Sequence, residues 1–171
     1  MAKGGLPRDW HKPLKVLADT LGIAFLSTPF SVDAAKFLVE DIGVGALKIA
    51  SGDLTFTPLL EYAACSGVPV ILSTGSSTLS EVRTARDAMD EASQYEVAGI
   101  VLMHCVSIYP CDDAFANLFA IRNLRDNLCE CVGFSDHTLS YDLIPALAVA
   151  CGASVLEKHI RLTEDRTSID A

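Results

Sequence analysis

The sequence CVGFSDHTLSYDLIPALAVACGASVLEKHI, residues 131–160, decides the fold because it predicts a strand, a helix and a second strand in succession. The two apolar strands are expected at 131–134 and 153–156, with a helix over 140–152 between them. Strands joined by such a helix run parallel, so their carboxyl ends meet at one edge of the sheet. Both strands end there in a short run of polar residues.

These polar runs contain two histidines, His137 and His159. Because side chains alternate along a strand, Ser135 shares a face with His137, and Glu157 shares a face with His159. Two imidazoles and a carboxylate at neighbouring strand ends suit a divalent metal with positions left for substrate. Either histidine alone would more simply be a hydrogen-bonded strand-end residue, but the two together favour a metal site.

The composition fits one α/β domain with a sizeable core. The chain has 171 residues, of which 50% are hydrophobic and 20% are charged. Its net charge of −9 argues against nucleic acid as a partner, because a phosphate backbone needs a basic surface. No run approaches the roughly 20 apolar residues of a membrane span, and the N-terminus has no signal-peptide core, so we expect no membrane association and a cytoplasmic location. The six scattered cysteines form no CxxC pair and indicate buried thiols in a reducing compartment.

Strand-like and helix-like segments alternate six times along the chain. The strands are expected at 23–26, 46–50, 68–72, 99–104, 131–134 and 153–156. They are mostly continuous apolar runs, which is typical of strands covered on both faces. This rhythm gives either a closed (β/α)₈ barrel or an open doubly wound sheet. Polar clusters after nearly every strand favour the barrel, because an open sheet concentrates its site at one switch point.

Six predicted strands are two fewer than a (β/α)₈ barrel needs. The helix predicted at 6–20 would follow a strand that the sequence lacks, and the last strand would have no helix after it. We therefore expect residues 1–171 to form one partial catalytic barrel that holds strands three to eight. Its two unpaired edges would promote self-association.

Capping signals mark several helix starts. Thr78 and Glu81 have the spacing of a capping box, and Asn117 is expected to cap a helix that runs to about residue 127. In the first predicted helix, Trp10 lies on the apolar face and His11 is expected at the surface.

One apolar predicted strand, 46–50, contains a lysine. Lys48 is in phase with the small residues Ala46 and Ala50, whereas Leu47 and Ile49 suit the side that faces the helices. A lysine in that position is costly unless its charge meets an anion. We expect Lys48 to point into the barrel; the alternative is a side chain that extends outward to solvent between helices.

Hydroxyl side chains would surround Lys48 at the barrel mouth and make a cradle for phosphate or carboxylate oxygens. They are Thr28, Ser51, Ser73, Ser107 and Ser135. Tyr109 points either into the mouth or against its rim. His104 has the opposite phase, so we expect it to be buried and hydrogen-bonded under the helices. Asp136 and Lys158 are expected to pair with each other or to orient the metal ligands.

Six stretches, in order, resemble the sialic acid synthase family, the phosphoenolpyruvate-condensing enzymes that make N-acetylneuraminate and related nonulosonic acids. They are FLSTPF, LKIASGDL, PLLEYAACSGVPVILSTG, HCVSIYP, GFSDHT and EKHI, and the resemblance extends from about Trp10 to Asp170. It implies a (β/α)₈ catalytic barrel and a homodimer in full-length members. In that dimer a C-terminal antifreeze-like domain, which is not expected within residues 1–171, reaches the partner's active site.

By this resemblance, His137 and His159 match the histidines that hold a divalent metal, typically manganese, with magnesium or cobalt as alternatives. Positions that match phosphoenolpyruvate contacts are Lys48, Thr28, Ser51, Ser73 and Ser135, and also Ser107, where some members have asparagine. Tyr109 and Glu157 match positions near the N-acylated sugar. Asp170 matches an aspartate that helps bind the sugar or a metal-bound water, although the Gly-Pro that usually precedes it is Ser-Ile here.

The resemblance implies that phosphoenolpyruvate condenses with an open-chain N-acyl amino sugar, such as N-acetylmannosamine, to give a nonulosonic acid and phosphate. The metal would polarise the sugar aldehyde, C3 of phosphoenolpyruvate would attack it, and water would add at C2 as phosphate leaves. Lys48 would balance the charge of the anion, Glu157 would move a proton, and Tyr109 is the third candidate catalytic residue.

Two other functions fit the same sequence. The chain could be a non-catalytic remnant of such an enzyme that keeps only the fold. It could also be another phosphoenolpyruvate-using barrel, such as a 3-deoxy-heptulosonate phosphate synthase. Turnover of N-acetylmannosamine compared with phosphorylated aldoses would separate the second alternative from a sialic acid synthase.

Overall fold

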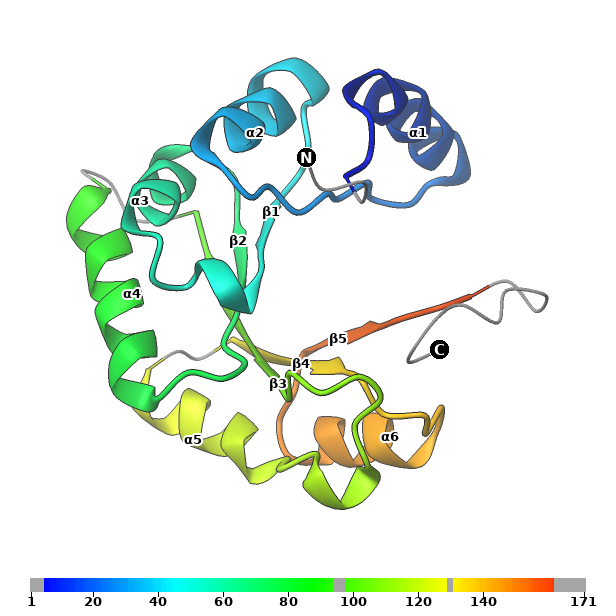
Figure 1. The fold of residues 1–171 in the computed structure, drawn as a ribbon, viewed down its shortest axis with the longest axis vertical. Helices are drawn as coiled ribbons and strands as arrows, with labels where there is room; N and C mark the ends of the chain where they lie inside the picture. Colours follow the sequence, from blue (N-terminus) through cyan, green and yellow to red (C-terminus); the bar gives the residue numbers. More distant parts are fainter. Residues whose placement is uncertain (1–4, 94–97, 129–130, 162–171) are drawn as a thin grey trace.

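The computed structural model of the chain describes residues 5–93, 98–128 and 131–161 and shows a parallel sheet curled into half a barrel, with the helices outside it (Figure 1). The strands are β1 (Leu47–Ile49), β2 (Val70–Ser73), β3 (Ile100–Cys105), β4 (Val132–Asp136) and β5 (Val155–Lys158). Each strand pairs in parallel with the next one along the chain. The predicted α/β class and the parallel arrangement are confirmed for the described residues.

Helices connect the strands and form an outer arc around the sheet (Figure 1). They are α1 (Arg8–Leu21), α2 (Val32–Lys36), α3 (Thr57–Cys65), α4 (Leu79–Ala92), α5 (Phe119–Asn127) and α6 (Leu143–Ala150). A π-helical turn, η1 (Phe37–Ile42), continues α2, and short 3₁₀ turns lie at η2 (Ser51–Asp53) and η3 (Asp113–Phe115). Within the described ranges, no helix is long and apolar enough to cross a membrane.

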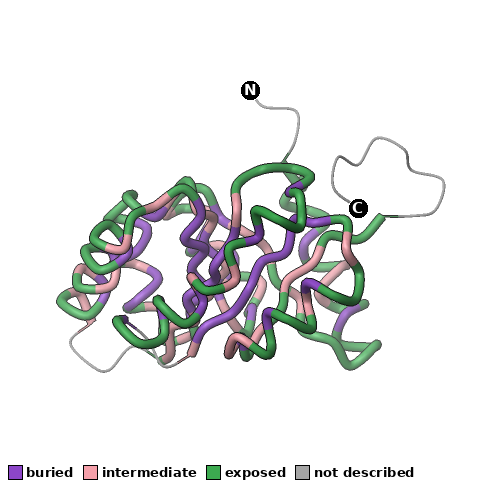
Figure 2. Tube along the Cα trace, turned by 90° about the horizontal axis from the view of Figure 1, so that it is seen from below, coloured by how far each residue is buried: buried purple, intermediate pink, exposed green. Residues whose placement is uncertain are grey.

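The hydrophobic core lies between the outer face of the sheet and the helices, as the buried inner part of the trace indicates (Figure 2). Ile49, Leu72, Leu102 and Val132 stand side by side in register across β1 to β4, and each is fully buried. Each such side chain contributes about 1.5–3 kcal/mol through burial. This layer fixes which strand residues face inward, because the alternate positions must face the barrel interior.

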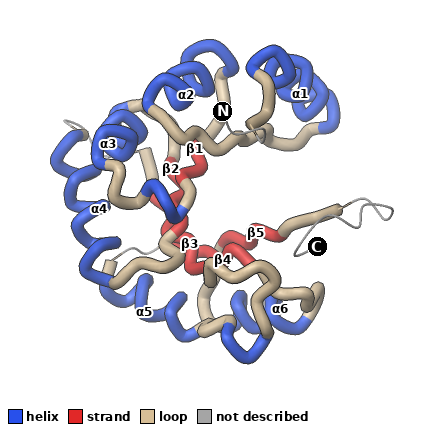
Figure 3. The backbone as a smooth tube through the Cα atoms, viewed as in Figure 1, coloured by secondary structure: helices blue, strands red, loops and turns tan. Residues whose placement is uncertain are grey.

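The strand predicted at residues 23–26 is not formed, so the described sheet has five strands and β1 is its edge (Figure 3). Gly22, with a φ of 70°, ends α1, and the chain then runs without regular structure to α2. Phe25 packs against the core, whereas Ile23 is 60% exposed. The apolar run has no ladder with β1; the Ile23 amide donates to the carbonyl oxygen of Ala18 at 3.0 Å, and Phe25 packs on the core.

The first helix buries a different face from the one predicted. Trp10 is 57% exposed, whereas His11, the next residue, is buried. Ala18, two helical turns after His11, is buried on the same face. The prediction that His11 lies at the surface is wrong. Its Nδ1 is 3.0 Å from the carbonyl oxygen of Pro7, and its Nε2 is 3.3 Å from Ser27 Oγ. A histidine can be buried here because both ring nitrogens have partners.

The capping predictions have mixed outcomes. The capping box at α4 is confirmed: Thr78 Oγ1 accepts from the Glu81 amide, and the Thr78 amide donates to the Glu81 carboxylate at 2.7 Å. The prediction that Asn117 caps the next helix is wrong, because Leu118 precedes α5 directly. Asn117 instead has a φ of 48°, the left-handed conformation that asparagine tolerates better than most residues.

His104 lies on the outer face of β3, as its phase predicted. It is 7% exposed, its Nε2 is 2.9 Å from the carbonyl oxygen of Ala116, and its ring stacks on Phe134. Burial lowers the pKa of this imidazole below its ordinary value of 6.5, and the hydrogen bond to Ala116 only partly opposes that effect. The neutral ring is therefore part of the folded core.

Acid should destabilise the fold through His104. Its folded pKa lies below its unfolded value of 6.5, so its contribution to stability is present above pH 6.5 and is lost as the pH falls below that value. We expect the Tm of the wild-type protein to fall more between pH 7.5 and 5.5 than that of His104→Gln. Equal pH dependence of the two melting temperatures would show that the burial of His104 has no such effect.

The described fold should also self-associate in solution. β1 and β5 each pair on one side only, and the nearby apolar residues Trp10, Leu17 and Leu21 are all more than half exposed. We expect residues 1–171 to form dimers or larger assemblies in light scattering. The double variant Trp10→Lys, Leu17→Lys should shift the distribution towards monomer. A monodisperse wild-type monomer would contradict this prediction.

Candidate active site

The inner face of the curled sheet carries a layer of polar residues near the carboxyl ends of the strands. Parallel pairing sets Cys105, Ser135 and Glu157 side by side in register on β3, β4 and β5. Below them the buried Met103 fills the interior and lies over Gly133, where a Cβ would come within 2.3 Å of the Met103 sulfur. On this face, apolar packing by Met103 therefore lies beneath the polar layer.

Lys48 reaches across this interior. Its Nζ donates to Ser73 Oγ at 2.7 Å and lies 3.5 Å from Glu157 Oε2, and its side chain is 12% exposed. The pair joins β1 to β5, the first and last strands of the described sheet, so it exists only because the sheet curls. The predicted inward orientation of Lys48 is confirmed, and the outward alternative is wrong.

Glu157 connects the lysine to one of the histidines. Its Oε1 accepts from Ser135 Oγ at 2.6 Å, and the same hydroxyl is 3.3 Å from His137 Nε2. The structure thus brings together Lys48, Glu157, Ser135 and His137 in one chain of polar contacts. The carboxylate therefore contacts the lysine through one oxygen and the serine through the other.

The two histidines predicted to hold a metal lie close together. The His137 and His159 rings stack at 5.4 Å between centroids, and Tyr109 packs against His137 at 4.1 Å. His137 Nδ1 is 2.6 Å from the carbonyl oxygen of Val106 and donates to it. This arrangement is common for imidazoles that bind metals.

These residues fit a divalent metal as two of its ligands. Across residues 5–93, 98–128 and 131–161, no three His, Cys, Asp or Glu side chains cluster closely enough to hold a metal ion. The remaining ligands would have to be water, substrate or side chains from elsewhere.

A second ion pair supports the histidine end of the site. Asp136 is 2% exposed on its side chain and accepts from Lys158 Nζ at 2.8 Å and from the Thr138 amide at 2.8 Å. This pair holds β4 and β5 together where His137 and His159 begin. The predicted pairing of Asp136 with Lys158 is confirmed.

The turn after β2 supplies a residue that the sequence analysis did not identify. The Gly75 amide donates to Ser51 Oγ at 2.9 Å, and Ser51 Oγ is 3.3 Å from Cys105 Sγ. A Cβ on residue 75 would lie 2.4 Å from Ser107 Oγ and 2.8 Å from the Cys105 sulfur. Only glycine lets these hydroxyl and thiol groups converge. The sequence signal that could have identified Gly75 is its position directly after Ser73 and Thr74, at the end of a predicted strand.

Two predicted site residues are not brought to this cluster by the described contacts. Thr28 lines a separate cavity of about 320 Å³ beside α1 and α2, together with His11 and Ser27. It lies in the segment that does not join the sheet, so nothing in the ladder fixes it beside Lys48. Asp170 lies outside the described residues.

Comparison with known proteins gives consistent matches over the chain. The NeuB family model matches residues 1–171. An N,N'-diacetyllegionaminic acid synthase from Legionella pneumophila is 42% identical over 162 residues, which make up 92% of this chain and 44% of that protein. A crystal structure of an N-acetylneuraminic acid (sialic acid) synthetase from Leptospira borgpetersenii in complex with citrate has a TM-score of 0.85 at 40% identity, covering 97% of this chain and 57% of that one.

A more distant likeness concerns the fold alone. Phospho-2-dehydro-3-deoxyheptonate aldolase (DAHP synthase) from Thermotoga maritima has a TM-score of 0.74 at 18% identity, over 90% of this chain and 47% of that one. The chain spans less than half the length of the Legionella relative. Because the family model matches along the whole chain, the chain belongs to the NeuB family.

Proposed function

We propose that this chain forms part of a nonulosonic acid synthase that condenses phosphoenolpyruvate with an N-acyl amino sugar and releases phosphate. On this proposal the curled sheet is part of a (β/α)₈ barrel, and the enzyme works in the cytoplasm as a homodimer. The observation that carries the proposal is the contact of Lys48 with Ser73 and Glu157 beside the paired imidazoles. Family membership and the synthases among its relatives support it.

Lys48 would hold the anionic substrate. Its ammonium group is nearly enclosed, and the hydroxyl of Ser73 lies within hydrogen-bonding distance. A phosphate or carboxylate at this position would compete with Glu157 for the lysine charge. Binding of phosphoenolpyruvate would thereby release Glu157 from its ion pair, so that its carboxylate could accept a proton from the water that adds at C2.

The paired imidazoles would hold the divalent metal, for which we propose manganese. When bound, this ion supplies Lewis-acid polarisation of the sugar aldehyde. The hydrogen bond from His137 Nδ1 to Val106 would orient the ring so that Nε2 is the atom that binds the metal. Tyr109 packs against both rings, at 4.1 and 5.9 Å between centroids, and would contact the sugar at the mouth.

A turnover assay tests this function directly. Residues 1–171, alone and within any longer reading frame that contains them, should be incubated with phosphoenolpyruvate, manganese and either N-acetylmannosamine or a phosphorylated aldose. We expect the longer protein to release phosphate with the N-acyl sugar and not with the aldose, and residues 1–171 alone to release none, because they form only part of the barrel. Release only with the aldose would indicate a DAHP-type synthase, and a well-folded complete protein with no turnover on N-acyl sugars would indicate a non-catalytic remnant.

Replacing Lys48 should weaken anion binding without unfolding the protein. Lys48→Met keeps the aliphatic stem but removes the charge, and a charge-assisted hydrogen bond is worth about 1.5–3 kcal/mol. We expect the KM for phosphoenolpyruvate to rise by about 10- to 100-fold, measured by steady-state phosphate release. Lys15→Met, the same replacement on the outer helix α1, is the matched control and should change nothing. Unchanged kinetics for Lys48→Met would place this lysine outside the site.

Replacing either paired histidine should remove the metal. We expect His137→Ala and His159→Ala each to abolish manganese-dependent turnover and to weaken manganese binding, measured by electron paramagnetic resonance, whereas His104→Ala should reduce stability only. The physical reason is that His104 faces the helices and the other two face the mouth. Loss of manganese binding in His104→Ala with normal binding in His137→Ala would overturn this assignment.

A further inference from the structure

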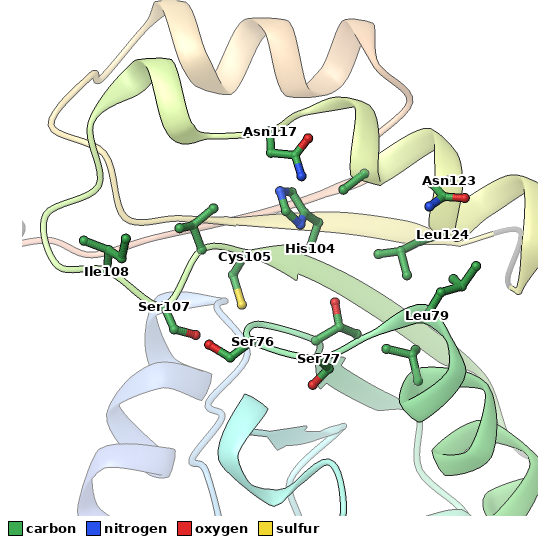
Figure 4. A pocket seen from close by; sticks show the side chains of 14 residues that line it. Ser76, Ser77, Leu79, His104, Cys105, Ser107, Ile108, Asn117, Asn123 and Leu124 are labelled. Carbon is green, nitrogen blue, oxygen red and sulfur yellow. The ribbon is translucent and has the colours of Figure 1, made fainter.

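A cavity of about 370 Å³ lies on the outer side of β3, between α4 and α5 (Figure 4). His104 lines it, with Ser77 and Leu79 on the α4 side and Asn117 and Asn123 on the α5 side. Its volume is at the lower end of the roughly 300–1,000 Å³ typical of small-molecule sites. His104 is on the face of the sheet opposite to Lys48, whereas Cys105 and Ser107 extend the cavity towards the barrel mouth.

His104 presents an acceptor to this cavity. Its Nε2 is bonded to the Ala116 carbonyl oxygen, so Nε2 carries the single proton of the neutral ring and Nδ1 keeps a lone pair. Among the described residues, every side-chain nitrogen or oxygen that is fully enclosed has a hydrogen-bond partner. His104 Nδ1 has no such partner, so it is not fully enclosed. It follows that Nδ1 borders the open space of the cavity and can accept a hydrogen bond from a ligand.

The opposite wall offers a donor. Asn123 Oδ1 accepts from Asn127 Nδ2 at 2.8 Å, which leaves the amide hydrogens of Asn123 for a ligand. Ser77 Oγ donates to the Gly75 carbonyl oxygen at 3.3 Å and can still accept through its lone pairs. Leu79 and Leu124 supply apolar surface beside these groups. The walls thus combine donors, acceptors and apolar contacts, as a site for a small polar molecule requires.

The charge pattern indicates an uncharged ligand. No residue that lines the cavity is acidic or permanently basic. An anion would find no cation to pair with. The amino end of α4 does not substitute for one, because the Glu81 carboxylate already caps it.

Backbone conformation gives an independent observation. Ser76 and Asn117 are the two non-glycine residues with positive φ in the described part of the chain, at 58° and 48°. Both line this cavity, one from each wall. Such conformations cost free energy for a serine and tend to occur where a loop is shaped for binding.

We propose that this cavity binds a small uncharged molecule with several hydroxyl or amide groups, of the size of one sugar ring. The ligand donates to His104 Nδ1, accepts from the Asn123 amide and rests on the apolar side chains of the two helices. The proposed ligand contacts do not involve Lys48 or the paired histidines, although Ser107 at the barrel mouth borders the same cavity.

Saturation-transfer difference NMR tests the proposal, and it tolerates self-associated protein. The probes are N-acetyl-D-glucosamine, D-glucose and myo-inositol, with D-glucose 6-phosphate as the anionic comparison. We expect at least one neutral probe to bind the wild-type protein and to bind Lys48→Met equally well. Asn123→Leu should weaken its binding by about tenfold, the effect of losing one or two neutral hydrogen bonds. Asn123 is exposed, so this variant keeps the fold.

The matched control is Asp126→Leu, which places the same new side chain at an exposed position of α5 outside the cavity. It should bind the neutral probe like the wild type. Binding lost in Lys48→Met but kept in Asn123→Leu would put the probe in the barrel interior and overturn the proposal. Equal weakening of binding in Asn123→Leu and Asp126→Leu would also overturn the proposal. The same holds if only the phosphate ester binds or if no neutral probe binds.

Discussion

The contact between Lys48 and Glu157 is the constraint on which the described site depends. A nearly enclosed ammonium group is tolerated only if an opposite charge or several hydrogen-bond acceptors reach it. Here the partner stands on β5, four strands away in the sheet, so the charge is satisfied only when the sheet curls until its first and last strands face each other. The hydrophobic layer outside the sheet drives the same curvature, since it buries the opposite side chains against the arc of helices.

Strand alternation then divides the work between two faces. Inward positions carry the polar side chains that could bind or react with a substrate. Outward positions in the core carry apolar side chains or His104, which is bonded to a carbonyl oxygen. Asp136 lies between the inward-facing Ser135 and His137 and points to the other side of the strand. It pairs with Lys158 and fixes the strand ends. A shift of one residue in the register would exchange these sets, placing Lys48 in the core and leucines at the mouth. Register therefore matters more to this site than any single hydrogen bond.

Much of this arrangement could be predicted from local pattern. Continuous apolar runs, strand-end polar clusters and the phase of Lys48 and His104 depend only on chain periodicity, which the fold preserves. The segment 23–26 could not be predicted, because whether an apolar run joins a sheet depends on a partner edge. The buried His11 was also missed, since its partners, Pro7 and Ser27, are brought together only by the turn at Gly22. Gly75 was missed because its role is the absence of an atom, visible only when Ser107 and Cys105 are in place.

Each described strand after β1 pairs with the strand that precedes it in the chain. No later strand is inserted between two earlier ones. During synthesis each new strand and helix can therefore dock onto a neighbour that has already left the ribosome, and long loops need not wait open for a distant partner. The exception is the ion pair that joins the two ends of the sheet, which cannot form until β5 has emerged. Until then Lys48 lacks this carboxylate partner, so the binding groups are assembled only after β5 has formed.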